Sequence, residues 1–131
     1  MTQAPAPRYS GFAPGQHPIE SFGSGGFRFA EMSHRGSILA LPSGVGAWAP
    51  TTPGDITAES LAPLFAEPAG IVELLIVGTG ADLVPLAPAL RDRLRAANIR
   101  FDPMATRVAI ATYNILLGER RRVAAAFLAV D

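Results

Sequence analysis

The sequence contains no cysteine and no lysine, and it has only two histidines. Without cysteine, the chain has no disulfides, thiol nucleophiles, iron–sulfur clusters or structural zinc ribbons. Without lysine, it has neither Schiff-base chemistry nor a P-loop lysine. His17 and His34 have no second ligand at the spacing typical of metal sites. We therefore expect that the chain binds no metal and no cofactor.

Charged residues are scarce as well, at 17% of the chain against about 25% in an average globular domain. The 11 arginines balance 11 acidic residues, so the formal net charge is zero. That balance argues against a nucleic-acid-binding protein that neutralises phosphates. The longest apolar run near the end, residues 123–130, is shorter than the roughly 20 residues of a membrane span. We therefore expect a cytoplasmic protein.

The 131 residues are enough for one domain with its own core. Proline, glycine, alanine and serine dominate the beginning, and such a composition buries too little apolar area to order itself. The sequence thus predicts a flexible N-terminal segment over residues 1–17 and a single domain over residues 18–131. Residues 27–29, 37–41 and 45–48 read as short antiparallel strands because their connections are short, with a turn at residues 34–37.

The second half alternates between helical and strand patterns. We expect helices over residues 56–65, 83–98 and 105–117, and strands over residues 71–77, 99–101 and 122–130. In the third helix, the spacing of five residues predicts a stripe that faces the core: Val108, Ala109, Thr112, Ile115 and Leu116. Alternation of this kind predicts an α/β fold, with a central mixed β-sheet flanked by helices and an N-terminal β-hairpin or meander.

A glycine-rich turn follows the most apolar strand. It comprises Gly78, Thr79, Gly80 and Asp82. A dinucleotide site belongs at such a position, because glycines let backbone N–H groups approach a pyrophosphate, and Asp102 follows after the next strand. Leu83 at the third glycine position and the negative charge of Asp82 oppose this reading. The alternative is a tight turn in which Asp82 caps the following helix.

Further polar residues lie at the start and in the middle of the third helix. Asp102 or Thr106 can cap this helix, and Arg107 can reach an anion near its first turn. Tyr113 and Asn114 can hydrogen-bond either a ligand or the backbone of a neighbouring loop, and backbone is the usual partner of a buried amide. Together with the glycine-rich turn, these residues form a candidate ligand or partner site.

Arg120, Arg121 and Arg122 form the only dense run of one charge. Three consecutive arginines are suited to bind a carboxylate-rich partner or anionic lipid headgroups. The alternative is a solvated turn in which Glu119 pairs with one of the arginines. Both readings remain open at this point.

Several segments of the sequence, read together, resemble the Mth938-like domain family, which includes the mitochondrial complex I assembly factor 3. The resemblance covers residues 18–130. The segments are Gly26-Phe27-Arg28-Phe29, Gly36-Ser37-Ile38-Leu39, Leu41-Pro42 with Trp48, residues 74–80, Met104-Ala105-Thr106, and residues 112–124. Two positions depart from the family pattern: Ala111 stands where members often carry arginine, and Arg120 where they often carry glycine.

The resemblance implies a mixed sheet with helices on one face and a hairpin plus a helix on the other. It implies no enzyme activity, and it suggests a module that assembles other proteins, peripheral to the inner membrane. We therefore favour a non-catalytic protein-interaction or assembly-factor-like module, with peripheral membrane association and a homodimer left open. The alternative is a protein, an enzyme among the options, that binds a small anionic ligand or nucleotide at the glycine-rich turn.

Overall fold

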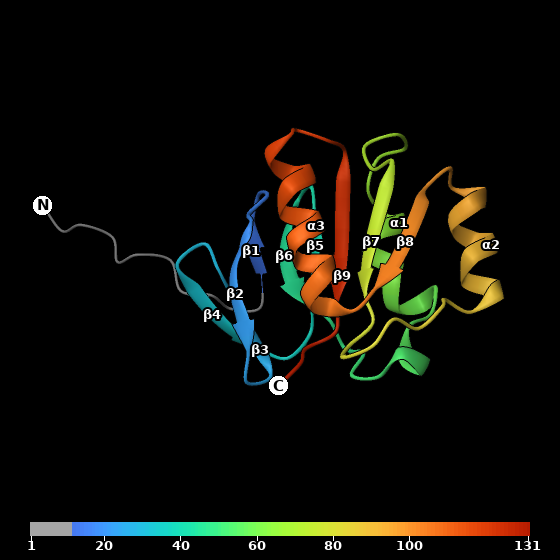
Figure 1. The fold of residues 1–131 in the computed structure, drawn as a ribbon. Helices are drawn as coiled ribbons and strands as arrows, with labels where there is room; N and C mark the ends of the chain where they lie inside the picture. The colour runs from blue at the N-terminus through green and yellow to red at the C-terminus, as the bar shows by residue number, and fades with distance from the viewer. Residues whose placement is uncertain (1–11) are drawn as a thin grey trace, which may run out of the picture.

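A six-stranded sheet forms the middle layer of the structure, a computed structural model that describes residues 12–131 (Figure 1). Its strand order is β1-β6-β5-β9-β7-β8. The strands are β1 (Phe12–Pro14), β5 (Ile38–Leu41), β6 (Gly44–Ala47), β7 (Leu74–Gly78), β8 (Arg100–Met104) and β9 (Val123–Phe127). The sheet is mixed, because β9, β7 and β8 are parallel while β1, β6, β5 and β9 pair antiparallel.

Two helices connect the three parallel strands. Helix α2 (Pro88–Ala96) leads from β7 to β8, and helix α3 (Thr106–Gly118) leads from β8 back across β7 to β9. The two connections run in opposite directions along the sheet, so right-handed crossovers place their helices on opposite faces. The buried apolar residues form two hydrophobic cores. Residues of α2 belong to one core and residues of α3 to the other, which agrees with this arrangement.

The central strands are buried on both faces because their side chains alternate between the two cores. Leu75 and Val77 of β7 face the α2 side, whereas Ile76 between them faces the α3 side. This is why β7 reads as an almost continuous apolar run. In β9, Ala124, Ala125 and Ala126 are all fully buried, and their small side chains let both layers pack closely on the sheet.

A second, three-stranded sheet lies on the α3 side of the molecule (Figure 1). Its strands are β2 (Ile19–Gly23), β3 (Gly26–Phe29) and β4 (Met32–Arg35). Phe27 of β3 is buried, with its ring centroid 6.0 Å from that of Phe127 in β9. The predicted α/β class, with a central mixed sheet and an N-terminal hairpin region, is confirmed.

Several boundaries differ from the prediction. Phe12–Pro14, inside the segment expected to be flexible, pair with β6, and residues 1–11 lie outside the described part of the chain. The turn predicted at residues 34–37 is wrong for His34 and Arg35, which belong to β4. Strand β8 continues through Asp102 and Pro103 instead of ending there, because an edge strand tolerates a proline.

The first predicted helix is shorter than expected. In place of a helix over residues 56–65 the structure has two 3₁₀ turns, Pro53–Asp55 and Glu59–Leu61, followed by α1 (Ala62–Phe65). The Thr57 hydroxyl accepts a hydrogen bond of 3.1 Å from the amide of Ser60, but the N-cap of the second 3₁₀ turn is Ala58. Within residues 12–131, no helix combines the length and the hydropathy needed to cross a membrane.

Helix α3 ends in a left-handed residue that is not glycine. Arg120 has φ +60°, and the amides of Arg120 and Arg121 donate to the carbonyls of Leu117 and Leu116. This pattern is a Schellman motif, whose left-handed position favours glycine. Helix α2 closes in the same way around Asn98, with φ +58°. Gly118 itself is the last helical residue of α3 and does not occupy the left-handed position.

We expect Arg120→Gly to raise the free energy of unfolding by about 0.5–1 kcal/mol, because glycine adopts φ above zero without steric cost. The matched control is Asn98→Gly, which should change stability by only a few tenths of a kcal/mol because asparagine already tolerates this conformation. Urea unfolding followed by fluorescence measures both. Equal changes in the free energy of unfolding for the two substitutions would contradict the view that the gain in Arg120→Gly comes from backbone conformation.

Candidate functional site

A cleft of about 630 Å³ opens at the carboxyl ends of β7, β8 and β9. In open α/β sheets, ligands bind in the crevice outside these strand ends. The glycine-rich turn forms one side of the cleft, the start of α3 another, and the end of the chain a third. The polar and charged side chains that line it are those of Thr51, Thr52, Thr79, Asp82, Arg107 and Asp131.

The glycine-rich turn is held by hydrogen bonds within the protein. The Thr79 hydroxyl donates to the carbonyl of Asp82 at 2.6 Å and accepts from the amide of Val84 at 3.0 Å. The Thr79 amide donates to the carbonyl of Met104 at 2.9 Å. Thr79 is buried, so its polar groups stabilise the turn and none of them points freely into the cleft.

Thr106 joins three segments below the cleft. Its hydroxyl donates to the carbonyl of Leu128 at 2.9 Å and accepts from the amide of Gly80 at 3.0 Å, while its own amide donates to the Gly80 carbonyl at 2.8 Å. A Cβ atom on Gly78 would lie 2.9 Å from this hydroxyl, so the glycine is needed for close packing. Both Gly78 and Thr106 therefore act in the structure of the turn.

The turn differs from a dinucleotide site in one decisive respect. Helix α2 does not follow it directly, because residues 79–87 form no helix and Ala87, the residue before Pro88, is extended with ψ 144°. Asp82 thus caps no helix, and both the predicted start of the helix near Leu83 and the capping role of Asp82 are wrong. Because no helix begins directly after the turn, the helix N-terminus that would bind a phosphate there is missing.

The other predicted site residues are dispersed. Asp102 is exposed on β8, paired with Ile76, and does not line the cleft. The N-cap of α3 is Ala105, with no hydrogen bond from its side chain, so neither Asp102 nor Thr106 caps this helix. Of the predicted set, Thr79, Gly80 and Asp82 line the cleft, together with Arg107.

Tyr113 belongs to the core beneath α3 and not to a ligand site. Its ring packs edge-on against Phe127 at a centroid distance of 5.6 Å, and the residue is 1% exposed. Burial raises the pKa of the Tyr113 phenol to about 12, because the charged form loses hydration. The phenol is therefore neutral across the physiological pH range.

Asn114 binds backbone, as one of the two readings predicts. Its side-chain Nδ2 donates to the carbonyl of Ile19 at 2.8 Å, and its Oδ1 accepts from the amide of Ile19 at 2.9 Å. The side chain thereby satisfies both backbone groups of one residue, as a neighbouring strand would. Asn114 attaches β2 and the three-stranded sheet to α3.

Two of the three consecutive arginines bind one carboxylate, that of Glu73. Arg121 and Arg122 each place an Nη2 atom 2.9 Å from a different oxygen of Glu73, and Arg122 Nη1 donates to the carbonyl of Gly70. The predicted partner, Glu119, forms no ion pair with them in the described part of the chain. The two arginines lower the pKa of Glu73 below its usual value of 4.5 through hydrogen bonds.

The ion pairs of Glu73 predict a pH-dependent contribution to stability. A carboxyl whose pKa is lower in the folded protein stabilises the fold above its unfolded pKa, and this contribution is lost as pH falls through the folded pKa. We expect Glu73→Gln to lower the urea midpoint at pH 7, and the difference from the wild type to shrink as the pH falls through the folded pKa of Glu73. A difference between the two proteins that is independent of pH would contradict the assignment.

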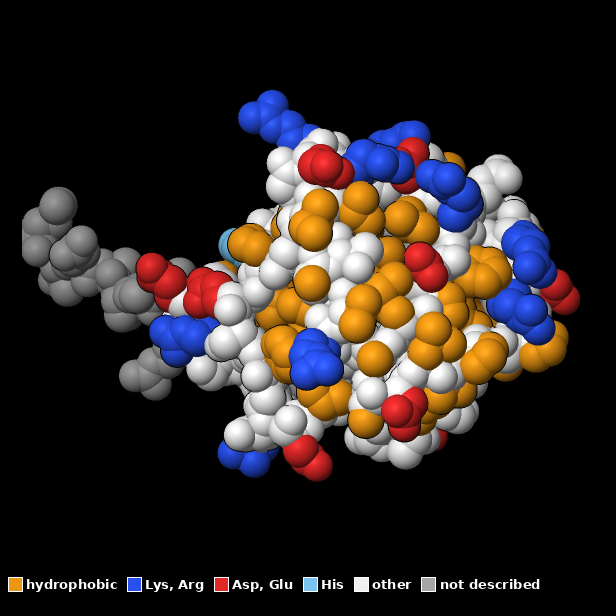
Figure 2. All heavy atoms as spheres, in the orientation of Figure 1, with side chains coloured by type: hydrophobic (Ala, Val, Ile, Leu, Met, Phe, Trp, Pro, Cys, Tyr) orange, Lys and Arg blue, Asp and Glu red, His pale blue; other side chains and the backbone are white. Residues whose placement is uncertain are grey.

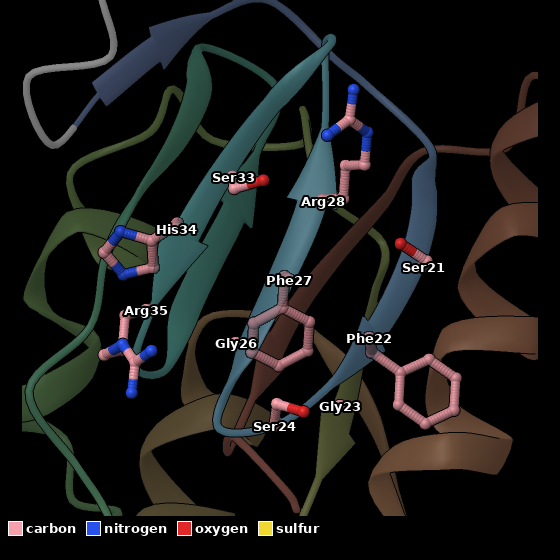
Figure 3. Close-up of a pocket in the computed structure, with 10 residues that line it drawn as sticks. All are labelled: Ser21, Phe22, Gly23, Ser24, Gly26, Phe27, Arg28, Ser33, His34 and Arg35. Carbon is pink, nitrogen blue, oxygen red and sulfur yellow. The ribbon is translucent and has the colours of Figure 1, made fainter.

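A second hollow, of about 470 Å³, lies on the outer face of the three-stranded sheet (Figure 3). Ser21, Arg28 and Ser33 stand opposite one another on the three strands, and Arg28 pairs with Glu20 at 3.4 Å. Sequence reasoning had not singled out this surface. Residues 12–131 hold no cluster of three or more side chains that could bind a metal ion.

Sequence reasoning also missed the outer face of α3. Val108, Thr112 and Ile115 were expected to face the core, but Val108 is 51% exposed and Ile115 is 62% exposed. The buried stripe of the helix is Thr106, Ala109, Ile110 and Tyr113. The error arose because α3 carries apolar residues on both faces: residues 108–118 contain no charged side chain. We define the outer stripe of α3 as Val108, Ala111, Thr112 and Ile115.

Comparisons with known proteins give consistent matches. Residues 19–128 match the model of a family described as a protein of unknown function (DUF498/DUF598). An uncharacterized protein of Rhodobacter capsulatus is 42% identical over 94% of this chain and 92% of its own length. The NADH dehydrogenase [ubiquinone] 1 alpha subcomplex assembly factor 3 of Xenopus tropicalis is 33% identical over 84% of this chain, which spans 60% of that relative.

Solved structures share the fold. A crystal structure described as an outer membrane protein from Bartonella henselae superposes with a TM-score of 0.86 at 44% identity, covering 90% of this chain and 98% of that one. A solution structure of a Bordetella pertussis protein described as a Mth938-like domain gives a TM-score of 0.71 at 28% identity, covering 98% of this chain and 92% of that one. The predicted resemblance to Mth938-like domains is confirmed.

Proposed function

We propose that this chain, which belongs to the DUF498/DUF598 family of Mth938-like domains, is a non-catalytic protein-interaction module that supports the assembly of a membrane-associated respiratory complex. Relatives from four vertebrates carry the name of an assembly factor of NADH dehydrogenase. Their name supports an assembly role, and the proposal extends it to this shorter chain. A cytoplasmic location, peripheral to the inner membrane, is part of the proposal.

The observation that carries this proposal is the outer stripe of α3. A surface helix of a globular protein normally has charged residues opposite its core face, whereas a helix that is apolar all round is normally covered. Here eleven consecutive residues, 108–118, are uncharged although Val108 and Ile115 lie at the surface. Figure 2 shows hydrophobic side chains gathered in the middle of the face that α3 fronts in Figure 1. Such a face is suited to bind another protein.

The glycine-rich turn supports the same proposal. The hydroxyls of Thr79 and Thr106 and the backbone amide of Gly80 all form hydrogen bonds within the protein. Polar groups that are already bonded within the protein are not available to bind or act on a substrate. A role in binding proteins therefore agrees better with this chemistry than catalysis does.

Deletion of the gene in the organism that encodes the chain tests the proposal. We expect less fully assembled NADH dehydrogenase on native gels, with partial complexes accumulating, and recovery when the wild-type gene is returned. An unchanged amount of assembled complex in the deletion strain would overturn the proposed function.

The second candidate function is binding of a small anionic ligand or nucleotide in the cleft. The position of Arg107 beside Gly80, at the carboxyl ends of the parallel strands, favours it. Thermal-shift measurements with nucleotides and anionic metabolites test this candidate, with Arg107→Ala as the comparison. A ligand that raises the melting temperature of the wild type but not of Arg107→Ala would support it, and the absence of any shift would reject it.

A further inference from the structure

The hollow on the outer face of the three-stranded sheet is lined by hydrogen-bond donors that are free to bind a ligand. The hydroxyls of Ser21, Ser24 and Ser33 and the guanidinium of Arg35 form no hydrogen bond or ion pair within residues 12–131. Strand β3, in the middle of this sheet, pairs with β2 and β4, so side chains have to supply the contacts. None of the described residues that line the hollow carries a carboxylate, which favours a negatively charged ligand.

Arg28 stands in the same hollow and keeps most of its donors. Its Nε lies 3.4 Å from Oε2 of Glu20, a long contact for a charged pair, and the two side chains are about half exposed. The other oxygen of Glu20 accepts from the amide of Glu31, in the turn that follows β3. Arg28 itself donates no hydrogen bond within residues 12–131. Its Nη1 and Nη2 atoms therefore remain available to a second carboxylate.

The pairing of the strands sets the two arginines at opposite ends of the hollow. Arg28 lies opposite Ser33, and Arg35 lies opposite Gly26. Because Arg28 and Gly26 are two residues apart on one strand, Arg28 and Arg35 project from the same face as diagonal neighbours, with Cα atoms roughly 7–8 Å apart. Figure 3 shows their side chains extending towards opposite ends of the hollow.

Two glycines keep the end beside Arg35 open. A Cβ atom at Gly26 would collide with the carbonyl oxygen of His34, and Gly23 has φ +131°, a conformation that other residues rarely adopt. Ser24 lies in the turn between these glycines. This end therefore combines a floor of backbone with one guanidinium and one hydroxyl. Phosphate suits it, because its oxygens accept from several donors at once.

We infer that the hollow binds a small molecule with a phosphate at one end and a carboxylate at the other. The phosphate lies beside Arg35, at the end without a carboxylate, and the singly charged group accepts from the Nη atoms of Arg28. Ser21 and Ser33 flank Arg28 and bond polar groups between the two ends. The volume of about 470 Å³ suits such a molecule. This site is separate from the outer stripe of α3 and goes beyond the proposed assembly role.

An NMR titration of the isotope-labelled chain tests the inference at constant ionic strength. The probe is 3-phosphoglycerate, and glycerol 3-phosphate, which lacks the carboxylate, is the matched ligand. We expect saturable shifts of amides in β2, β3 and β4 with millimolar affinity, and binding of glycerol 3-phosphate that is weaker by about threefold to tenfold. No saturable shift up to about 20 mM 3-phosphoglycerate, or shifts at Gly80 and Arg107 in the cleft instead, would overturn the inference.

Arginine variants assign the two ends of the ligand. Arg35→Gln should weaken both ligands at least about tenfold, whereas Arg28→Gln should weaken only 3-phosphoglycerate and make the two ligands bind equally. Glu20→Gln should strengthen 3-phosphoglycerate several-fold, because the Glu20 carboxylate competes for Arg28. Arg100→Gln, exposed on β8, is the control and should change neither affinity. An equal loss in Arg100→Gln, or a difference between the ligands that persists in Arg28→Gln, would overturn the assignment.

Two further readouts keep the outcome specific. The amide spectrum of each variant shows whether it is folded. A phosphoserine peptide that binds the same strands at least about tenfold more tightly than 3-phosphoglycerate would overturn the assignment to a small molecule. These measurements use purified protein alone, so their failure is distinguishable from failure of the proposed assembly function, which is read on native gels of cells.

Discussion

Thr106→Val is expected to lower the free energy of unfolding by about 2–4 kcal/mol, although valine has nearly the shape of threonine. The buried hydroxyl is the hydrogen-bond partner of the Gly80 amide and of the Leu128 carbonyl. Valine leaves both groups without this partner, and an unsatisfied buried polar group costs about 1–3 kcal/mol. Urea unfolding, followed through the single buried tryptophan, Trp48, measures the loss.

Thr106→Ser is the control for this prediction. Serine keeps the hydroxyl and removes only a methyl group, so we expect a loss of about 1 kcal/mol. If valine and serine destabilised the protein equally, the hydroxyl would not be what joins the glycine-rich turn, α3 and the end of β9. The turn would then have to be held by packing around Gly78 instead.

Asn114→Asp is expected to destabilise the protein by about 2–3 kcal/mol at pH 7, more than the roughly 1–2 kcal/mol of Asn114→Ala. The carboxylate cannot donate to the carbonyl of Ile19, 2.8 Å away in the wild type, and places a negative oxygen beside it. Alanine only removes the two hydrogen bonds. Comparing the free energies of unfolding of the two variants therefore separates repulsion between the carboxylate and the Ile19 carbonyl from simple loss of the hydrogen bonds.

The Asn114→Asp variant also has a defined pH dependence. The neutral carboxyl can donate again to the Ile19 carbonyl, so folding raises the pKa of the new carboxyl above its unfolded value of about 3.9. The variant is therefore fully destabilised at a pH above the pKa of the carboxyl in the folded protein. The destabilisation disappears as the pH falls below the pKa of that carboxyl in the unfolded chain. A difference from the wild type that persists unchanged to pH 3 would contradict the assigned hydrogen bonds.

Much of the fold was predictable because local sequence dictates it. The run of apolar residues in β7 identifies a strand buried on both faces, and the alternation around Arg28 identifies β3. The start of α2 was also readable in principle. Pro88 is suited to the first helical position and restricts Ala87 to an extended conformation, although the spacing of leucines suggested an earlier start.

The candidate site was harder to predict because its contacts are not local. Asn114 bonds to Ile19, 95 residues earlier, and Thr106 bonds to Gly80 and Leu128. One sequence does not reveal which backbone group a buried amide or hydroxyl will meet. In α3, two apolar stripes share one helix, so periodicity alone could not tell the buried stripe from the exposed one.

We propose that the chain acts through the outer stripe of α3 and not through the cleft. The most direct test is to return variants to the deletion strain and measure assembled NADH dehydrogenase on native gels. Ile115→Glu should fail to restore assembly, whereas Ala81→Trp, which places a large side chain at the cleft, should restore it. The opposite result, restoration by Ile115→Glu and failure of Ala81→Trp, would contradict the claim.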